Sequence, residues 1–302
     1  MRVSENASRI GGMALVVASA VVLSACAAWG DENVVSNQLR DLSADEIDIA
    51  EARAENTNRI FDPEFEGRIV VMNDASGIES ARELFSDSGS LVLTDDTDSA
   101  ILRGASIAVS QHIPMVVFNP EERLEVQSLI ADLGVTRLLV VGDVRWAEQE
   151  GELNVIRDPG STKALGDYTA FVFESKVVAK PSDMFADIVS LEPGGKVELK
   201  PAWENPTVNT EHDKMPAIPA QSRRDGEVAP NMVATAHTPL PNLINARSYG
   251  AEVLVMPNAD PRHDEVSHAM VAGLSDGPLV ALGPEFGSVK EISEKIAQAD
   301  AE

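Results

Sequence analysis

The only cysteine in the 302-residue chain is the residue whose position points most directly to chemistry. Cys26 directly follows Ala25 and comes shortly after an apolar run over residues 10–22. Arg2 and Arg9 both precede that run. A basic start, an apolar centre and a small-residue cleavage site are typical of a secretory signal. Because there is no second cysteine, no disulfide and no Cys-based metal site can form.

The four residues Leu23-Ser24-Ala25-Cys26 resemble the lipobox of bacterial lipoproteins. The resemblance implies that residues 1–25 are a signal peptide, that a diacylglyceryl thioether forms on the Cys26 sulfur, and that the new N-terminus is acylated, as with palmitate. Several acyl chains anchor a protein durably, whereas one binds only reversibly. The expected location is the outer face of the bacterial cytoplasmic membrane, facing the cell wall. The alternative is an ordinary secretory signal with a chance cysteine.

Polar side chains that follow the predicted strands form a second set of candidates. In an open α/β sheet, ligands bind beyond the carboxyl ends of the strands. The ligand-binding candidates are Thr94, Asp95, Asn119, Asp143, Thr235, Asn258 and Asp260. Asn119 and Asp260 also precede helices, whose N-termini could hold an anion. The alternative is that each of these residues is an ordinary turn or capping residue.

The sequence contains no recognisable catalytic motif. It has no nucleophile elbow, phosphate-binding glycine loop or zinc-protease motif. His263 and His268 are five residues apart, a spacing that does not place two ligands on one helix face. Asp95, Asp96 and Asp98 could attract Ca²⁺, but an EF-hand's glycine and distal glutamate are missing. We therefore expect no catalytic residue, no metal and no cofactor.

Acidic residues dominate the charge of the chain. There are 49 Asp and Glu against 24 Lys and Arg, a formal net charge of −25. Removing residues 1–25 takes away Arg2, Arg9 and Glu5, a net +1, which leaves −26. Such a charge repels nucleic acid and excludes it as a partner. Simple solubility outside the cell would also explain it.

Short apolar strands alternate with amphipathic helices from residue 68 onward. This pattern indicates parallel sheets that are covered by helices on both faces. The predicted strands of the first run are 68–72, 91–93, 114–118 and 138–143, and helices are predicted over 78–85, over 100–109 and after Asn119. A second run has predicted strands over 232–235, 252–256 and 279–283.

The second run repeats the first at a constant offset. Thr94 and Thr235, Pro120 and Pro261, and Gly142 and Gly283 are each 141 residues apart. Only the middle strand slips, by about three residues. The sequence therefore predicts an internal duplication: two related three-layer α/β units with mostly parallel sheets, joined by a Pro-rich irregular segment.

These patterns divide the mature chain into four parts. Residues 26–60 form an acidic tether with a surface helix over 43–54, capped by Ser43 with Glu46 in a capping box. Residues 61–150 and 231–302 are the two units. Residues 151–230 are an insertion, with strands over 168–178 and 196–199, a helix over 184–189 and closely spaced prolines after residue 200.

Residues 67–144 resemble a type-2 cell-wall-binding repeat domain. The matching segments are Ser80-Ala81, Leu91-Val92-Leu93, Ser99-Ala100-Ile101, Pro114-Met115-Val116-Val117 and Val140-Val141-Gly142-Asp143, with Glu252 to Met256 and Leu282-Gly283 in the second copy. Ser99 and Asp143 depart from the family's Asp and Gly, and only two copies are present where the family often has three. The resemblance implies a non-catalytic domain that contacts wall polymers.

Two functions of different class remain open. The first is a lipid-anchored envelope protein whose α/β domains contact wall polymers. The alternative is a solute-binding lipoprotein that holds a small ligand between the two units. A polar, concave gap between the units would favour solute binding, whereas a filled interface would favour the envelope protein. A hydrolase or transferase would need a convergent acid–base pair, which the sequence does not show.

Overall fold

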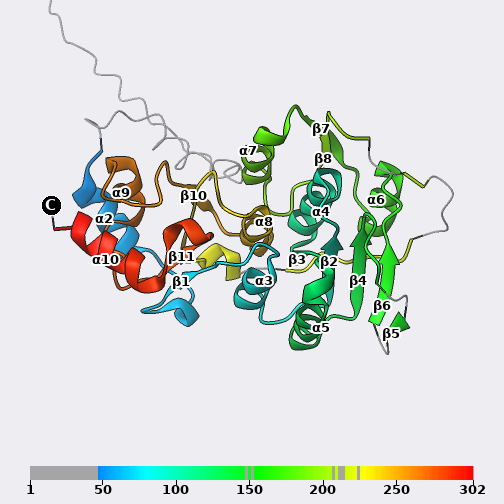
Figure 1. The fold of residues 1–302 in the computed structure, drawn as a ribbon, viewed down its shortest axis with the longest axis horizontal. Helices are drawn as coiled ribbons and strands as arrows, with labels where there is room; N and C mark the ends of the chain where they lie inside the picture. The colour runs from blue at the N-terminus through cyan, green and yellow to red at the C-terminus, as the bar shows by residue number, and fades with distance from the viewer. Residues whose placement is uncertain are drawn as a thin grey trace, which may run out of the picture. The chain divides into compact units, whose positions relative to one another are not determined.

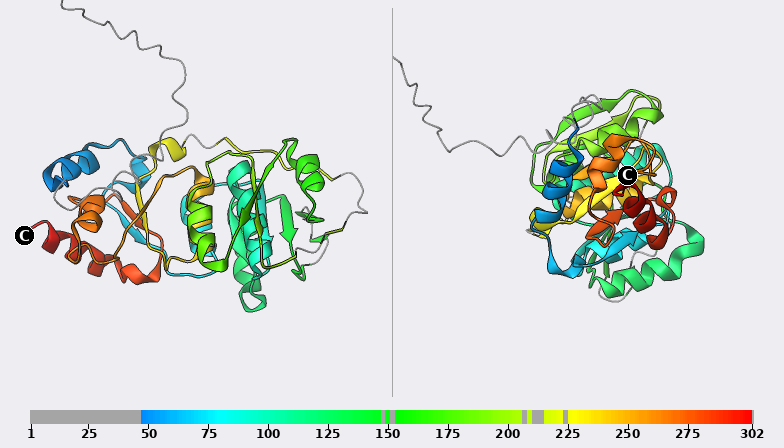
Figure 2. Two further views of the ribbon diagram at one scale, coloured as in Figure 1. Left: turned by 90° about the horizontal axis from the view of Figure 1, so that it is seen from above. Right: turned by 90° about the vertical axis from the view of Figure 1, so that its left-hand side faces the viewer.

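The computed structural model describes residues 47–146, 149–150, 153–205, 208–209, 215–222 and 225–301. The predicted signal sequence, the predicted lipidation site Cys26, and the predicted capping residues Ser43 and Glu46 lie outside these residues. Two predominantly parallel β-sheets with packed helices make up most of the described chain (Figures 1 and 2). The predicted α/β class with mostly parallel sheets is therefore confirmed.

The first sheet has the strand order β3-β2-β4-β6-β5. Its strands are β2 (Ser90–Thr94), β3 (Met115–Val117), β4 (Arg137–Val141), β5 (Gln149–Glu150) and β6 (Leu153–Arg157), and only β5 runs antiparallel. The chain runs from β2 outward through α4 (Asp98–Gln111) to β3, then back through α5 (Arg123–Asp132) to β4. Because both crossovers are right-handed by rule, α4 and α5 cover opposite faces.

The second sheet repeats this order with equivalent elements. Its order is β10-β9-β11-β1, all parallel. The equivalent elements are β9 (Asn231–Ala234), α8 (Leu240–Tyr249), β10 (Val253–Val255), α9 (Glu265–Val271) and β11 (Leu279–Ala281), followed by α10 (Val289–Ala299). The matching strand order, with the middle strand displaced by about three residues, supports the predicted duplication.

The fourth strand of the second sheet comes from the other end of the chain. β1 (Ile69–Val71) pairs with β11, with Ile69 opposite Leu279 and Val71 opposite Ala281. It occupies the place that β6 has beside β4. Residues 61–150 therefore do not form a self-contained unit: β1 belongs to the second sheet, and β6 of the predicted insertion belongs to the first. The physical reason is that β11 pairs with β9 on one side and presents its other edge to β1, a contact between residues far apart in the chain that no local pattern announces.

The segment predicted as a tether ends in a docked helix. α2 (Ile49–Asn58) begins after Asp48, whose side chain caps its first turn. The Asn56 amide donates to the carbonyl oxygens of Ala269 and Ala272 at 3.0 and 3.1 Å, which fixes α2 against α9. The predicted range 43–54 is thus shifted, and the tether does not extend to residue 60.

The insertion adds a small parallel pair of strands to the first sheet's helix layer. It contains α6 (Thr162–Thr169), β7 (Glu174–Val178), α7 (Met184–Val189) and β8 (Val197–Pro201). β8 packs along α4, where the Leu199 amide donates to Ser106 Oγ at 2.8 Å. The helix predicted over 184–189 is confirmed. The strand predicted from residue 168 is wrong in its first part, because Ser161 caps a helix there that ends at Thr169.

The remaining short elements in the described ranges are α3, four 3₁₀ turns that begin at a proline and one further 3₁₀ segment. α3 (Ile78–Leu84) follows β1 and contacts α5 and α8. The 3₁₀ turns are Pro63–Phe65, Pro120–Glu122, Pro181–Asp183 and Pro284–Phe286, and each begins at a proline, whose fixed φ suits a first helical position. A further 3₁₀ segment spans Asp225–Val228.

The interface between the two sheets is filled. α8 packs against α3 and α4 (Figure 1). Leu243 and Ile244 of α8 share one buried core with Leu91 and Leu102. Asn245 on α8 holds the edge strand β3: its Oδ1 accepts from the Met115 amide at 2.7 Å, and its Nδ2 donates to the Met115 carbonyl at 3.0 Å. The described residues of α3, α4 and α8 therefore form a packed interface rather than the polar gap that would favour solute binding.

Candidate functional site

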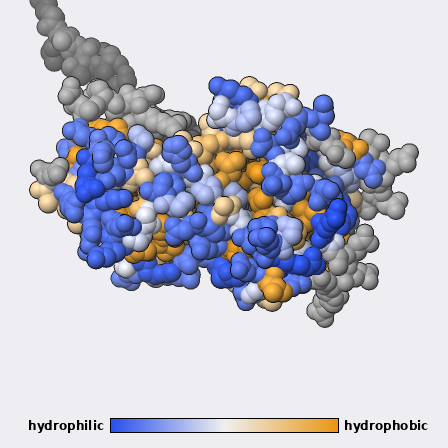
Figure 3. All heavy atoms as spheres, viewed as in Figure 1, coloured by the Kyte–Doolittle hydropathy of each residue, from blue (hydrophilic) through white to orange (hydrophobic). Residues whose placement is uncertain are grey.

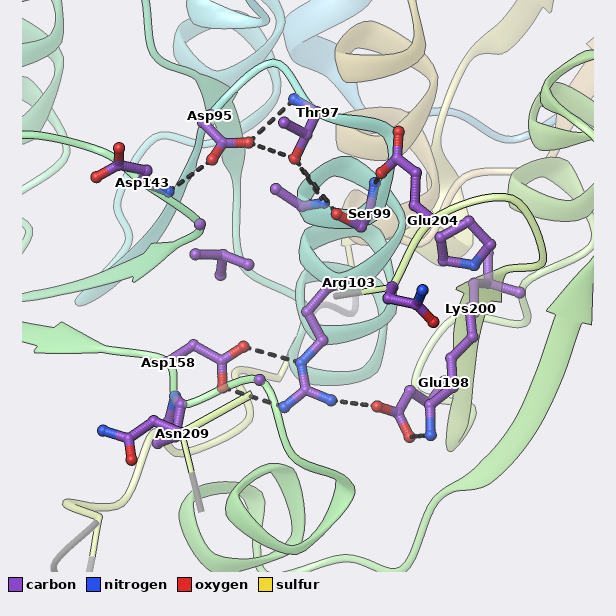
Figure 4. A pocket seen from close by; sticks show the side chains of 18 residues that line it. Asp95, Thr97, Ser99, Arg103, Asp143, Asp158, Glu198, Lys200, Glu204 and Asn209 are labelled. Carbon is purple, nitrogen blue, oxygen red and sulfur yellow. Dashed lines mark hydrogen bonds and ion pairs between the residues drawn. The ribbon is translucent and has the colours of Figure 1, made fainter. Parts of the chain in front are cut away.

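A cavity of about 730 Å³ opens at the carboxyl edge of the first sheet (Figure 4). It lies beyond the ends of β2, β4 and β6, between the first turns of α4 and the end of β8. This is the place where the strand order reverses between β2 and β4, which is where open α/β sheets bind ligands. Its polar lining residues are Asp95, Thr97, Ser99, Arg103, Asp143, Asp158, Glu198, Lys200, Glu204, Asn205 and Asn209.

Asp95 ties together the loops that form one side of the cavity. Its Oδ2 accepts from the Asp143 amide at 2.6 Å, and its Oδ1 accepts from the amide and hydroxyl of Thr97 at 3.0 and 2.6 Å. Gly142 has φ +82°, and a Cβ there would collide with the Asp95 carboxylate. Glycine is therefore required at the end of β4 so that Asp95 can bridge the two loops.

Three buried charged residues, Arg103, Asp158 and Glu198, form the floor of the cavity. The Arg103 guanidinium donates to both carboxylate oxygens of Asp158 at 2.9 and 3.0 Å and pairs with Glu198 on its other side. The side chains of Arg103, Asp158 and Glu198 are only 8, 1 and 2% exposed. Glu198 also accepts from Thr162 at 2.7 Å and pairs with Lys200 at 3.0 Å. Each of these buried charges is thus compensated, as burial requires.

The pKa values of Arg103, Glu198 and Tyr168, whose hydroxyl donates to Asp158, are all shifted away from neutral pH. Burial alone would lower the pKa of Arg103, but Tyr168, Asp158 and Glu198 hold it above its usual value. Burial alone would raise the pKa of Glu198, but hydrogen bonds such as that from Thr162 and the charge of Arg103 lower it. Burial raises the pKa of Tyr168 well above its usual value. None of the three is poised to exchange a proton near pH 7.

The mouth of the cavity carries unused acceptors. The Asp143 carboxylate is exposed and has no hydrogen-bond or ion-pair partner among the described residues. Glu204 accepts a hydrogen bond from the Ser99 amide through Oε2 at 3.0 Å, and its Oε1 has no partner among the described residues. In the view of Figure 4 the two carboxylates lie on opposite sides of Asp95 and Thr97. This side of the cavity therefore carries carboxylate oxygens without a partner among the described residues.

The sequence candidates of the first copy divide between this cavity and its surroundings. Asp95 and Asp143 line it. Thr94 is fully buried at the end of β2, and its hydroxyl has no hydrogen-bond partner among the described residues. Asn119 caps the turn after β3, where its Oδ1 accepts from the Glu121 amide at 3.1 Å, and it does not line the cavity.

The sequence candidates of the second copy have local roles. Asn258 Oδ1 accepts from the Asp260 amide at 2.9 Å, and Asp260 pairs with Arg262 at 2.6 Å. The hydrogen bond from Arg262 holds the pKa of Asp260 well below its usual value. Thr235 donates to Glu285 at 2.7 Å. The structure does not bring these three residues to the cavity.

Most of the charged residues that line the cavity do not stand out in the sequence. Arg103, Asp158, Glu198, Lys200 and Glu204 were not candidates, and four of the five lie in the predicted insertion. One signal was present: Arg103 is a lone charge in the otherwise apolar or small residues of 100–109. A second was the pair Glu198 and Lys200, which a strand places on one face.

Within the described ranges, no cluster of three or more His, Cys, Asp or Glu side chains could hold a metal ion. In the same part of the chain, no helix has the length and apolar character needed to cross a membrane. Hydrophilic residues predominate on the face shown in Figure 3, with apolar residues interspersed.

Comparison with known proteins gives one structural similarity. No family model matches the sequence, and no curated protein matches it. Among solved structures, the chain is similar to "Cwp6 from Clostridium difficile", with a TM-score of 0.46 and 14% sequence identity. The similarity covers 76% of this chain and 48% of that chain, so it spans about half of the other protein.

Proposed function

We propose that the protein is a lipid-anchored, non-catalytic component of the bacterial cell envelope that holds a wall polymer in the cavity of its first sheet. The observation that carries the proposal is the cavity itself, with its hydroxyl, amide and carboxylate groups at the carboxyl edge of β2 and β4. Sugar chains present many hydroxyl groups, which suit such a polar lining. The sequence resemblances to a lipobox and to cell-wall-binding repeats support the same setting.

A binding role fits the charges better than a catalytic one does. General acid–base catalysis needs a group whose pKa lies near the working pH. The pKa of Glu198 in the cavity floor is lowered, and that of Tyr168, which donates to Asp158 from behind the lining, is raised, so both shift away from neutral pH. Arg103 is engaged on two sides by carboxylates. We therefore propose that the cavity binds its ligand without transforming it.

Sedimentation with purified cell wall tests the proposal. The full chain should pellet with wall material, and the assay is run with and without Ca²⁺. Ser99→Tyr puts a bulky side chain into the half-buried first turn of α4 and should abolish pelleting. Ser128→Tyr, at an exposed position on α5, is the matched control and should pellet normally. No pelleting of the unaltered chain under either condition would overturn the proposal.

The proposed anchor has its own test. Cys26→Ser removes the sulfur that would carry the lipid. The variant should leave the membrane fraction and appear in the soluble fraction. Unchanged membrane retention would refute the lipid assignment without bearing on the cavity.

One observation favours a second candidate function. A volume of about 730 Å³ lies within the range of small-molecule sites. A solute-binding lipoprotein would hold its ligand in this cavity, because the interface between the sheets is packed. The two functions differ in what saturates the site: a wall-polymer site needs an oligomer of several sugar residues, whereas a solute site is saturated by one small molecule.

A further inference from the structure

We infer that the cavity selects a cationic sugar segment, one that carries an unacylated amino group, over its N-acetylated or acidic counterparts. The inference rests on the proposed function, since it takes a saccharide to be the ligand. It goes further by naming the charge that the ligand carries. The evidence is the balance of charges around the cavity and the way in which those charges are already used.

Negative charge is in surplus around the cavity. Its lining contains five carboxylates and two cations. Arg103 is bound to Asp158 and Glu198, and Lys200 is bound to Glu198 and Thr162. Both cations therefore have partners in the floor. An incoming phosphate or uronate would meet no unengaged cation among the described lining residues, and burying its charge would be costly.

The acceptors that remain are at the mouth. They are the Asp143 carboxylate and Glu204 Oε1, which have no partner within the described part of the chain. A protonated amine offers three donors and a positive charge, so its hydrogen bonds to carboxylates are charge-assisted. A formal charge of −25 on the whole chain attracts cations over longer range. N-acetylation of the sugar removes the positive charge of the amine and leaves one N–H donor in place of three.

The second copy lacks the same groups, so we expect one ligand per chain. At the offset of 141 residues, Arg103 corresponds to Ile244, and Asp143 corresponds to Pro284. The equivalent edge, beyond β9 and β11, is occupied by the Glu285 side chain, whose Oε1 accepts from the hydroxyls of Thr235 and Thr238 at 2.7 and 2.6 Å. A carboxylate of the chain itself thus lies where the first copy has its ligand cavity.

Calorimetric titration of the full chain with two matched probes tests the inference. The probes are a glucosamine tetramer with free amines and the same tetramer fully N-acetylated. The free-amine tetramer should bind one per chain and roughly tenfold or more tighter, a difference of about 1.4 kcal/mol. Added salt should weaken it, because the attraction is electrostatic.

A double variant locates the effect in the mouth carboxylates. Asp143→Asn with Glu204→Gln keeps the shapes and leaves an oxygen for the Ser99 amide, but removes both charges. It should lose roughly tenfold or more in affinity for the free-amine probe. The control is Glu121→Gln with Glu125→Gln, at exposed positions just before and within α5. The control should bind like the unaltered chain, and urea midpoints verify that both variants fold.

The outcomes separate this inference from the proposed function. Equal binding of both probes, tighter binding of the N-acetylated probe, or an unaffected double variant would overturn the inference. Binding of neither probe, with wall sedimentation intact, would overturn the inference and leave the proposed function standing. Selective binding of the free-amine probe without wall sedimentation would support the inference and overturn the wall-polymer role.

Discussion

The two copies have the same strand order but use the same sheet edge in different ways. Beyond β2 and β4, Asp95 bridges two loops by accepting from the Asp143 amide and from Thr97, and a cavity remains. Beyond β9 and β11, the carboxylate of Glu285 accepts from two threonines instead. The bridging carboxylate comes from the β2 loop in one copy and from the β11 loop in the other. A duplicated fold can therefore keep its core and change its site through a few loop residues.

The two helices at the interface between the sheets show a second contrast. Gly104 on α4 corresponds to Asn245 on α8. A Cβ at Gly104 would press on Thr94 and the sulfur of Met115, at 2.6 and 2.8 Å. The glycine lets α4 approach its own sheet closely, whereas the asparagine reaches across to the backbone of β3. One position thus serves packing in one copy and edge protection in the other.

Arg103→Met should have the largest effect, because it replaces the buried cation of the first copy by an apolar side chain like its counterpart Ile244 in the second copy. The variant leaves Asp158 and Glu198 buried without compensation. Removing one partner of a buried ion pair costs about 3–5 kcal/mol. Urea unfolding should show a loss of that size.

The control for this loss is Arg82→Met. Arg82 pairs with Asp132 at the surface, where both side chains are about half exposed (45 and 51%). Such a pair is worth about 0–1 kcal/mol. Equal losses for the two variants would contradict the structural role given to the cavity floor.

Asn245→Ala should have the next largest effect. It leaves the buried amide and carbonyl of Met115 without their side-chain partner. A buried polar group without a partner costs about 1–3 kcal/mol, so we expect a loss of about 3 kcal/mol for the pair. Asn58→Ala on the exposed side of α2 is the control and should change the free energy of unfolding by less than about 0.5 kcal/mol. Similar, small losses for both would show that Asn245 does not hold the edge of β3.

Glu285→Ala tests whether the two sheet edges are independent of each other. It removes the acceptor of Thr235 and Thr238, and we expect a loss of about 1–2 kcal/mol in urea unfolding. Ligand affinity at the first copy should not change, because Glu285 does not line that cavity. A change in affinity would contradict the independence of the two edges.

The smallest expected effect is a pH dependence. The pKa of Glu198 in the folded protein lies below its ordinary value of 4.5. The stabilisation is therefore fully present above about pH 4.5 and is lost as pH falls toward the lower folded-state pKa. Urea midpoints measured from pH 6 to pH 3 should fall less steeply in Glu198→Gln than in the unaltered chain. Glu125→Gln, an exposed change on α5, should leave the slope unaltered, and an equal slope for all three proteins would contradict the assignment.

Much of the local structure could be predicted because it depends on neighbouring residues. Continuous apolar runs predicted the strands β2, β4 and β9. Asn119, as a capping residue, predicted the start of the turn at Pro120. The constant offset of 141 residues indicated two copies before any contact was known. A general rule about strand ends predicted Asp95 and Asp143 as ligand-binding candidates. The structure shows that both line the cavity.

The sequence alone establishes the order of strands and helices within the two repeated runs, their duplication and the acidic character of the chain. The tertiary structure decided that β1 pairs with β11, that α2 docks on α9, and that Arg103 meets Asp158 and Glu198 under a cavity. The physical reason is that a local pattern states which face of an element is apolar, but not which distant element covers it. Strand partners and buried ion pairs are contacts between residues far apart in the chain, and they exist only once the chain has packed.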